Sequence, residues 1–245
     1  MKRVIALGLG VIVTLLGLVS VTPAQAVDPP APVVMSYGLK ADGTVVALSA
    51  AAKAKASKQS RLAASCTWYD DGKCYWMNDN YTHFSHRNIC FQNNVGTYWD
   101  YLTAQSGFES GSSTVTFYNH GPGTGTPTSC AASPGWLPEQ ILTYGTYGTN
   151  DGLCAHYAWT LDLFDYYKTA TVAMNVSASR PAYCADTLQH RNKNISMAIG
   201  HILGLSVFNS STNLTASIMN TYFTAYNFPG TDDRNALYWL YQYSQ

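Results

Sequence analysis

The sequence predicts an α+β fold, in which a twisted mixed sheet with helices is followed by a C-terminal helical subdomain. Three observations lead to this prediction. Segments rich in β-branched and aromatic residues occur before residue 177, and such segments favour strands. Two helical stretches, one apolar and one amphipathic, occur after it. Six cysteines in a chain with an export leader predict that disulfides staple the fold.

The first 26 residues have the pattern of a secretory signal peptide. Lys2 and Arg3 precede an almost wholly apolar run over residues 4–21, and residues 24–26 (AQA) form a small-x-small cleavage site. A retained membrane anchor is the alternative, but the cleavage site directly behind the apolar run favours removal. No later stretch reaches the ~20 apolar residues that a membrane span requires. We therefore expect a secreted, extracellular protein with no membrane contact after cleavage.

Residues 27–65 are expected to form a flexible basic arm or linker. Three prolines open the segment, and residues 50–61 (AAAKAKASKQSR) are a small, basic, low-complexity stretch that favours a helix without an apolar face. A remnant propeptide and a wall-interacting tail are the alternatives. The folded domain is therefore expected to cover residues 66–245.

Charged residues are sparse, and beyond Arg61 the acidic residues outnumber the basic ones by twelve to seven. A nucleic-acid-binding surface would need a basic stripe on the folded part of the chain. The charge distribution therefore predicts no nucleic-acid partner.

Most or all of the six cysteines are expected to be paired. An even number in an exported chain is typical of an oxidising compartment, whereas a Cys–His metal cluster would favour a C-x-x-C pair, which the sequence lacks. Six cysteines allow fifteen pairings, and the sequence does not choose among them. The six are Cys66, Cys74, Cys90, Cys130, Cys154 and Cys184.

Local signals predict several elements between residues 66 and 177. Asp-Gly between two aromatic segments is a hairpin-turn signal, and Gly/Pro-rich stretches favour loops. The predicted elements are a hairpin at 68–76, a short helix at 94–107, strands at 113–118 (STVTFY) and 169–176 (TATVAMNV), and turn-rich loops at 120–134 and 144–152.

The last fifty residues carry the strongest helix signals. Residues 195–205 (ISMAIGHILGL) predict an apolar helix, and Gly204 near its end allows the backbone to leave the helix. A polar loop and the tripeptide at 217–219 (SIM) follow. Thr231 is the expected N-cap of a last helix with two aspartates in its first turn. The apolar face of that helix comprises Ala236, Leu237, Leu240 and Tyr241, with Trp239 near its edge.

This order of elements resembles that of the matrixin-like metzincins, a family of zinc metalloproteases. Their signature is H-E-x-x-H-x-x-G-x-x-H followed by a Met-turn, and the corresponding stretch here is 197–207 (MAIGHILGLSV). Met219 takes the Met-turn position, and the resemblance covers about residues 169–241. It implies a metzincin-like fold with a cleft between the sheet edge and the 195–205 helix. In active relatives that cleft binds an extended peptide as an added strand.

The resemblance also implies a zinc site from which most ligands are missing. Two histidines four residues apart share one helix face and, with a third histidine, would hold Zn²⁺. A glutamate beside the first would act as general base. Here His201 is the retained ligand position, Met197 and Val207 replace the other two, and Ala198 occupies the general-base position. We therefore expect no catalytic residue and no cofactor, while the packing residues of the stretch remain.

The expected function is that of a catalytically inactive pseudoprotease that binds a peptide or protein in the cleft. In this interpretation His201 is a hydrogen-bonded, partly buried side chain and Met219 packs in the core. An active zinc endopeptidase is one alternative, with His190 or Asp186 as substitute ligands. The other is an exported wall- or glycan-binding protein that uses exposed Tyr and Trp.

His83 and His86, at i and i+3, are a candidate surface metal pair. A solvated loop is the favoured interpretation of the same two residues. The sequence does not indicate an oligomeric state.

Overall fold

The computed structural model describes residues 33–59, 68–70, 73–75, 83–94, 107–109, 115–118, 140–161, 167–184, 187–208, 216–221 and 228–242. These residues belong to one compact unit, Pro32–Gln245. The elements, in chain order, are β1 (Val34–Leu39), β2 (Val45–Ala47), α1 (Ala50–Gln59), β3 (Trp68–Asp70), β4 (Lys73–Tyr75), β5 (Asn88–Asn93), β6 (Thr116–Tyr118), β7 (Ile141–Tyr147), β8 (Ala155–Leu161), β9 (Tyr167–Asn175), the 3₁₀ helix η2 (Ala182–Cys184), α3 (Leu188–Ile202) and α4 (Thr231–Tyr241).

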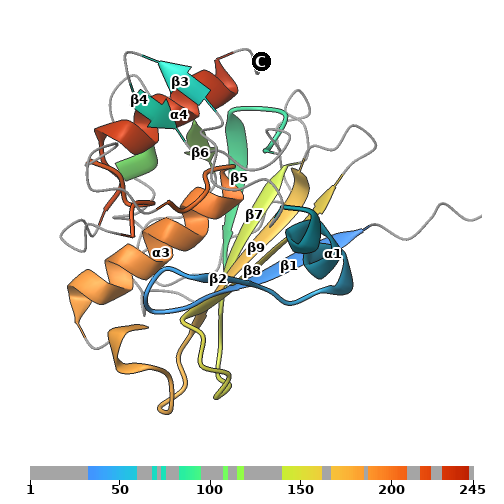
Figure 1. Cartoon of the computed structure of the whole chain (residues 1–245), viewed down its shortest axis with the longest axis vertical. Coiled ribbons are helices and arrows are strands. Elements are labelled where there is room, and N and C mark those ends of the chain that lie inside the picture. The colour runs from blue at the N-terminus through green and yellow to red at the C-terminus, as the bar shows by residue number, and fades with distance from the viewer. Residues whose placement is uncertain are drawn as a thin grey trace, which may run out of the picture. The chain divides into compact units, whose positions relative to one another are not determined.

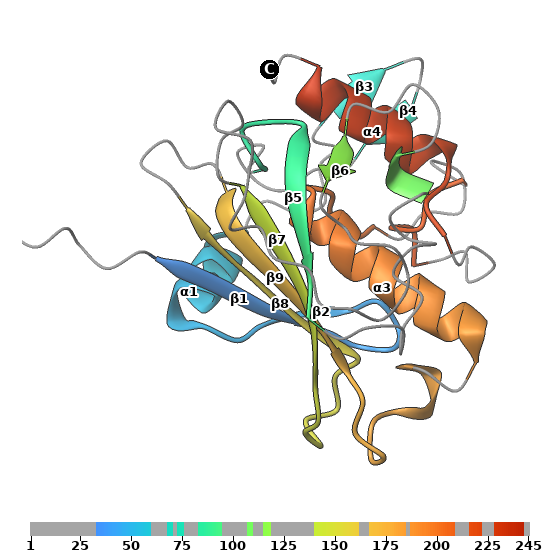
Figure 2. The ribbon, with the colours of Figure 1, turned by 180° about the vertical axis from the view of Figure 1, so that it is seen from behind.

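Seven strands form one mixed sheet in the order β2-β1-β8-β9-β7-β5-β6. The pairs β5–β6, β5–β7 and β7–β9 are parallel. The pairs β8–β9, β1–β8 and β1–β2 are antiparallel. Figure 2 shows how the strands fan out from β1 to β5, which is the twist expected of such a sheet. The prediction of a mixed sheet combined with helices and a disulfide is confirmed.

Helix α3 packs against β8 and β9, and its inward face supplies much of the core. Ile195, Ile199 and Ile202 are buried. Thr187 caps the helix, because its hydroxyl accepts a hydrogen bond from the His190 N–H at 3.1 Å. The predicted helix at 195–205 is therefore real but begins seven residues earlier than its apolar run.

The N-terminal segment contradicts the prediction of a flexible arm over residues 27–65. Strand β1 pairs with β8 along its whole length, from Val34 opposite Thr160 to Leu39 opposite Ala155. Met35, Leu39 and Ala52 are buried in the core. The folded domain therefore begins before Cys66. Asp42-Gly43 is a local hairpin signal that the prediction did not use, whereas the pairing of β1 with β8, a strand distant in the chain, has no local signal.

Helix α1 forms within the basic low-complexity stretch, as its composition predicts. The predicted hairpin at 68–76 is also confirmed, since β3 and β4 pair in antiparallel fashion with Tyr69 opposite Cys74. The strand predicted at 169–176 is β9, which lies at the centre of the sheet. Within the stretch predicted at 113–118, the structure describes β6.

Two local predictions were wrong. The loop predicted at 144–152 begins too early, because β7 continues to Tyr147 and Tyr144 is fully buried between strands. Thr231 is the first helical residue of α4 rather than its N-cap, which is Gly230. The signal peptide, the helix predicted at 94–107 and the loop predicted at 120–134 lie outside the described residues, apart from Asn94 and Gly107 at the ends of that helix segment.

Disulfides staple the fold as predicted. Cys154, just before β8, is bonded to Cys184 in η2, Cys90 is also disulfide-bonded, and the described residues include no free cysteine. Side-chain positions of Cys66, Cys74 and Cys130 lie outside the described part of the structure. The first bond ties the β7–β8 loop to the segment that leads into α3.

Removing the Cys154–Cys184 bond by paired alanine substitution should lower the free energy of unfolding by about 3 to 4 kcal/mol, because the bond closes a loop with a sequence separation of 30 residues. Urea denaturation of the two proteins measures the difference. A variant as stable as the wild type would show that the loop is held by its other contacts alone.

Among the described residues, no helix combines the length and apolar character needed to cross a membrane.

Candidate functional site

The candidate site lies where the C-terminal half of α3 meets the β1–β2 turn. Met197, Ala198 and His201 are all buried on α3. Met197 and His201 are four residues apart and therefore lie on one face of the helix. Figure 1 shows the segment between β1 and β2 passing beside this helix.

His201 is buried against the sheet. Its ring stacks on that of Tyr157 in β8, with ring centroids 5.0 Å apart and the planes 4° from parallel. Its Nδ1 lies 3.1 Å from the carbonyl oxygen of Leu205. A carbonyl only accepts, so Nδ1 carries the proton and Nε2 has the lone pair. Burial lowers the pKa of His201 to about 4, although the hydrogen bond to Leu205 opposes this shift. The imidazole is therefore neutral at physiological pH.

Helix α3 ends at Ile202, and Gly204, directly after the C-cap Leu203, turns the chain away from the helix as the sequence predicts. Gly204 has a φ of 102°, which is the left-handed region that glycine adopts without a steric penalty. The N–H of Gly204 donates to the His201 carbonyl at 3.1 Å, and that of Leu205 donates to the Gly200 carbonyl at 2.9 Å. This pair of bonds is a Schellman ending. It turns the chain so that Val207 reaches the half-buried surface beside the helix.

Met219 packs directly beneath α3. A Cβ added to Gly200 would lie 2.6 Å from the Met219 sulfur, so the glycine is what allows the two segments to approach. Met219 is 2 % exposed. The prediction that Met219 is a core residue is confirmed.

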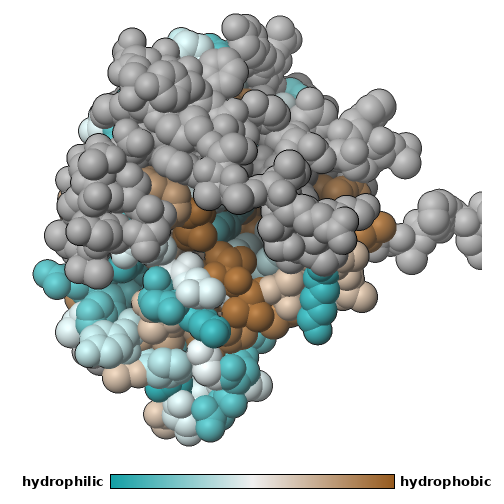
Figure 3. Space-filling view, viewed as in Figure 1, coloured by the Kyte–Doolittle hydropathy of each residue, from teal (hydrophilic) through white to brown (hydrophobic). Residues whose placement is uncertain are grey.

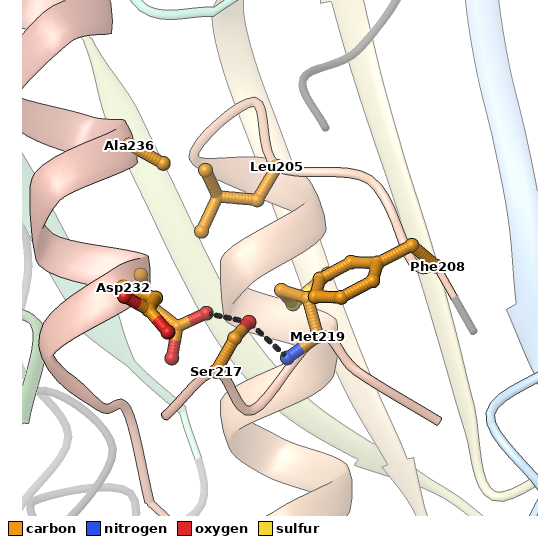
Figure 4. Close-up of a pocket in the computed structure, with 7 residues that line it drawn as sticks. Leu205, Phe208, Ser217, Met219, Asp232 and Ala236 are labelled. Carbon is orange, nitrogen blue, oxygen red and sulfur yellow. Dashed lines mark hydrogen bonds between the residues drawn. The ribbon is translucent and has the colours of Figure 1, made fainter. Parts of the chain in front are cut away.

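The turn that carries Met219 is fastened to α4 by Asp233. The Asp233 carboxylate accepts hydrogen bonds from the Ser217 hydroxyl at 2.5 Å, the Ile218 N–H at 2.7 Å and the Gly230 N–H at 2.8 Å. The Ser217 hydroxyl oxygen also accepts a hydrogen bond from the N–H of Met219 at 3.1 Å, as Figure 4 shows. Burial raises the pKa of Asp233 to about 6, although these hydrogen bonds oppose the shift.

The cavity drawn in Figure 4 is very small. Leu205, Phe208 and Ala236 are among its lining residues, and its volume is about 10 Å³. Such a space holds at most one water molecule. The hydrogen bonds of Ser217 and Asp233 fix the turn beneath α3.

The β1–β2 turn covers the first expected ligand position. Gly43 has a φ of 85°, and a Cβ added to it would lie 2.9 Å from Met197 Cε and 2.5 Å from Thr221 Cγ2. Any larger residue at position 43 would collide with both side chains. The thioether of Met197 is therefore packed beneath the protein's own hairpin.

A surface hollow of about 380 Å³ lies on one side of this turn. Val207 lines it together with Gly43 and Thr221, and Gly43 is the residue whose added Cβ would meet both Thr221 and Met197. The positions of the first and third expected ligands therefore both lie near Gly43. The fold therefore places Met197 and His201 on one helix face and Val207 near them, but only His201 of these three can bind a metal ion strongly.

Of the two substitute ligands considered from the sequence, His190 is not brought to this site. His190 lies on α3 eleven residues before His201, which corresponds to about 16 Å along a helix. It cannot share a metal ion with His201. Asp186 lies outside the described residues.

The interpretation of His83 as part of a solvated loop was wrong. His83 is 7 % exposed, and its ring packs edge-on against Tyr241 of α4 at 4.8 Å. His86 is half-buried. Within the described part of the chain, no three His, Cys, Asp or Glu side chains are grouped so that they could hold a metal ion.

Several residues of the site were missed from the sequence. Tyr157 lies in β8, whose alternating pattern AHYAWTL would have identified a strand. Gly43 belongs to an Asp-Gly pair that predicts a turn, but its contact with a helix more than 150 residues away in the chain has no local signal.

Comparisons with protein-family models, with curated proteins and with solved structures find no match to this chain. The relationship to the metzincins therefore remains a prediction from residues 169–241.

Proposed function

We propose that this protein is a secreted, catalytically inactive homologue of the matrixin-like metzincins that binds an extended segment of another protein. The observation that carries the proposal is the position of the N-terminal hairpin, β1–β2. Its first strand runs along β8, and its turn is seated on Met197. The hairpin occupies the place where a protease of this kind would need both its metal and its substrate.

Inactivity follows from the chemistry of the four motif positions. Met197 and Val207 offer no strong zinc ligand, and Ala198 offers no proton acceptor. His201 keeps the hydrogen bond to a carbonyl oxygen that is typical of a metal-binding histidine, which supports descent from a metal site. One imidazole is not enough to retain zinc.

Peptide binding in the ancestral manner would require a free edge on β8. That edge is paired with β1, whose Tyr37 stacks on Tyr157 and Trp159 of β8 at 5.7 and 5.0 Å. Displacing β1 would expose buried aromatic surface and break a six-residue ladder. We therefore place the peptide-binding edge at β2, the strand on the other side of β1.

Among the described strands, β2 is the last in the sheet on this side and pairs only with β1. The N–H of Lys40 donates to the Thr44 carbonyl, and that of Leu48 donates to the Ser36 carbonyl. Hydrogen-bonded pairs alternate in an antiparallel ladder, so Val46 is bonded to Gly38, which it faces. The N–H and C=O groups of Val45 and Ala47 therefore point away from β1. Such an edge is a template for an added strand.

An apolar surface accompanies this edge. Val45, Val207 and Phe208 line the hollow beside the turn, and Figure 3 shows hydrophobic surface down the middle of this face. Alternate side chains of an added strand point to the same face, so one of them would enter the hollow. This arrangement favours a peptide with an apolar side chain at that position.

Selection from a library of random peptides, each about six residues or longer so that it can form a strand, tests the proposal. We expect Val45→Pro to weaken binding of the selected peptides at least tenfold, because proline removes the outward N–H. Val45→Ala keeps that N–H and is the matched control for loss of the side chain. Fluorescence anisotropy measures both affinities, and thermal unfolding checks that both variants are folded.

Proline at 45 is expected to be tolerated because it begins the strand and its N–H does not bond to β1. Equal binding by the wild type and a folded Val45→Pro variant would contradict strand addition at β2.

A further inference from the structure

A second hollow lies on the other side of the β1–β2 turn. It has a volume of about 270 Å³ and is lined by Ala41, Tyr183, His190, Lys193 and Asn194. The α3 residues that line this second hollow come before Met197, the residue beneath Gly43. Val207 and Phe208, which line the first hollow, come after the end of α3. The turn therefore separates two distinct sites along one helix.

The walls of this second hollow are held rigidly. The Asn194 side-chain amide donates to the carbonyl oxygens of Tyr183 at 3.2 Å, Cys184 at 3.0 Å and His190 at 2.9 Å. Cys184 is in turn bonded to Cys154. These contacts fix η2 against the first turns of α3. A ligand would find the site already formed, which reduces the entropy cost of binding.

Among the described residues of this lining, Lys193 is the one lysine or arginine, and no acidic residue accompanies it. The side chain is half-buried and makes no ion pair with any residue in the described part of the chain. Burial lowers its pKa, which shows that the charged form is partly desolvated without compensation. An anion placed in the hollow would supply the missing partner.

Tyr183 gives the hollow an aromatic wall. It is 66 % exposed, and its ring contacts that of His190 edge-on with centroids 5.4 Å apart. An exposed aromatic ring on a rigid backbone offers apolar contact area at low entropy cost. The hollow thus combines one cation with one aromatic surface.

We propose that this hollow binds a small organic carboxylate, with the Lys193 ammonium holding the carboxylate group and Tyr183 packing against its apolar part. A single lysine matches a monoanion better than a phosphate, which carries more charge and favours several cationic partners. The volume is just below that of typical drug-sized pockets, which fits a compact acid. The site does not depend on the peptide-binding edge at β2.

Titration of the full mature chain with phenylacetate, followed by NMR chemical shifts, tests the site. We expect phenylacetate to shift the amide signals of residues 183 and 190–194, and phenylacetamide to bind at least tenfold more weakly, because it has the same ring without the charge. Acetate should also bind more weakly, because it lacks the ring. Lys193→Met should reduce phenylacetate affinity at least tenfold, whereas Lys53→Met, on the exposed side of α1, should leave it unchanged.

Three results would overturn this inference. They are equal binding of phenylacetate and phenylacetamide, unchanged affinity in Lys193→Met, and tighter binding of inorganic phosphate than of phenylacetate. Lys193→Gln provides a second neutral variant if the methionine variant does not fold. Val45→Pro should retain phenylacetate binding, so failure at β2 and failure at this hollow are distinguishable.

Discussion

Met197→His combined with Val207→His is expected to bind zinc with micromolar or tighter affinity, corresponding to about −8 kcal/mol, whereas the wild type binds none detectably. Residues 197 and 201 share one face of α3. The Nδ1–H of His201 already donates to the Leu205 carbonyl, which leaves Nε2 as the metal-binding nitrogen. Val207 lines the same hollow as Gly43, and Gly43 lies against Met197. Three imidazoles are therefore expected to converge there.

Metal analysis after dialysis and a competition titration with a chelating dye measure this effect. The matched control is Met197→His combined with Ser206→His, which has the same number of added histidines with the third one residue out of position. It should bind zinc at least a hundredfold more weakly. If the Met197→His, Val207→His variant folds normally but does not bind zinc, the three positions do not converge. That result would contradict the metzincin interpretation.

Adding Ala198→Glu to the zinc-binding variant should restore the general base but not the cleavage of long peptides. Strand β1 would still occupy the edge of β8, so an extended substrate could not align beside the metal. Cleavage of an unstructured protein by the triple variant would show that the hairpin leaves the cleft accessible.

Acidification from pH 7 to pH 4 is expected to act in opposite directions on two variants, His201→Phe and Asp233→Asn. The folded-state pKa of His201 is lowered to about 4 from 6.5. Its contribution to stability is therefore present above pH 6.5 and lost as the pH falls toward 4, because the unfolded chain takes up the proton first. The loss over this interval is about 2 to 3 kcal/mol.

Asp233 has the opposite dependence. Its folded-state pKa is raised from 3.8 to about 6, so the folded state binds the proton more tightly than the unfolded chain. Stability from this group is fully present below pH 3.8 and is lost as the pH rises through 6. Acidification from pH 7 to pH 4 therefore gains about 2 to 3 kcal/mol from Asp233, which nearly offsets the loss from His201.

Each variant removes one of the two titrations. Relative to the wild type, His201→Phe should become more stable on acidification and Asp233→Asn less stable, so that the two diverge by about 5 kcal/mol between pH 7 and pH 4. Urea denaturation at several pH values measures the divergence. Other titrating groups contribute equally to all three proteins and cancel. Parallel pH profiles for the two variants would contradict this assignment.

The motif at 197–207 and the tripeptide at 217–219 were sufficient to locate the candidate site. Helix α3 follows from its apolar run, and the Gly204 ending follows from the freedom of glycine at positive φ. The burial of Met219 follows from its place in an apolar tripeptide. These are local properties, because each depends on residues within a turn or two of one another.

Only the tertiary structure revealed that the β1–β2 hairpin covers the candidate site. Residues 34–47 (VMSYGLKADGTVVA) have an Asp-Gly turn signal between two short β-branched or aromatic runs. The proline-rich opening and the basic stretch that flank them led instead to the prediction of a flexible arm. Pairing with β8 supplies the hydrogen bonds and buried aromatic contacts that stabilise the hairpin. A composition rule cannot report a partner strand more than a hundred residues away.

The sequence by itself determined the disulfide-stapled mixed sheet, the helix that carries His201, and the absence of ligands at positions 197 and 207. The tertiary structure decided that the N-terminal hairpin covers Met197, that β2 and not β8 is the open edge, and that Tyr183 and Lys193 share a hollow. The first group could be predicted because side-chain chemistry and helix periodicity depend only on residues that are near one another in the chain. Strand pairing and surface hollows arise from contacts between segments whose separation in the chain carries no signal of its own.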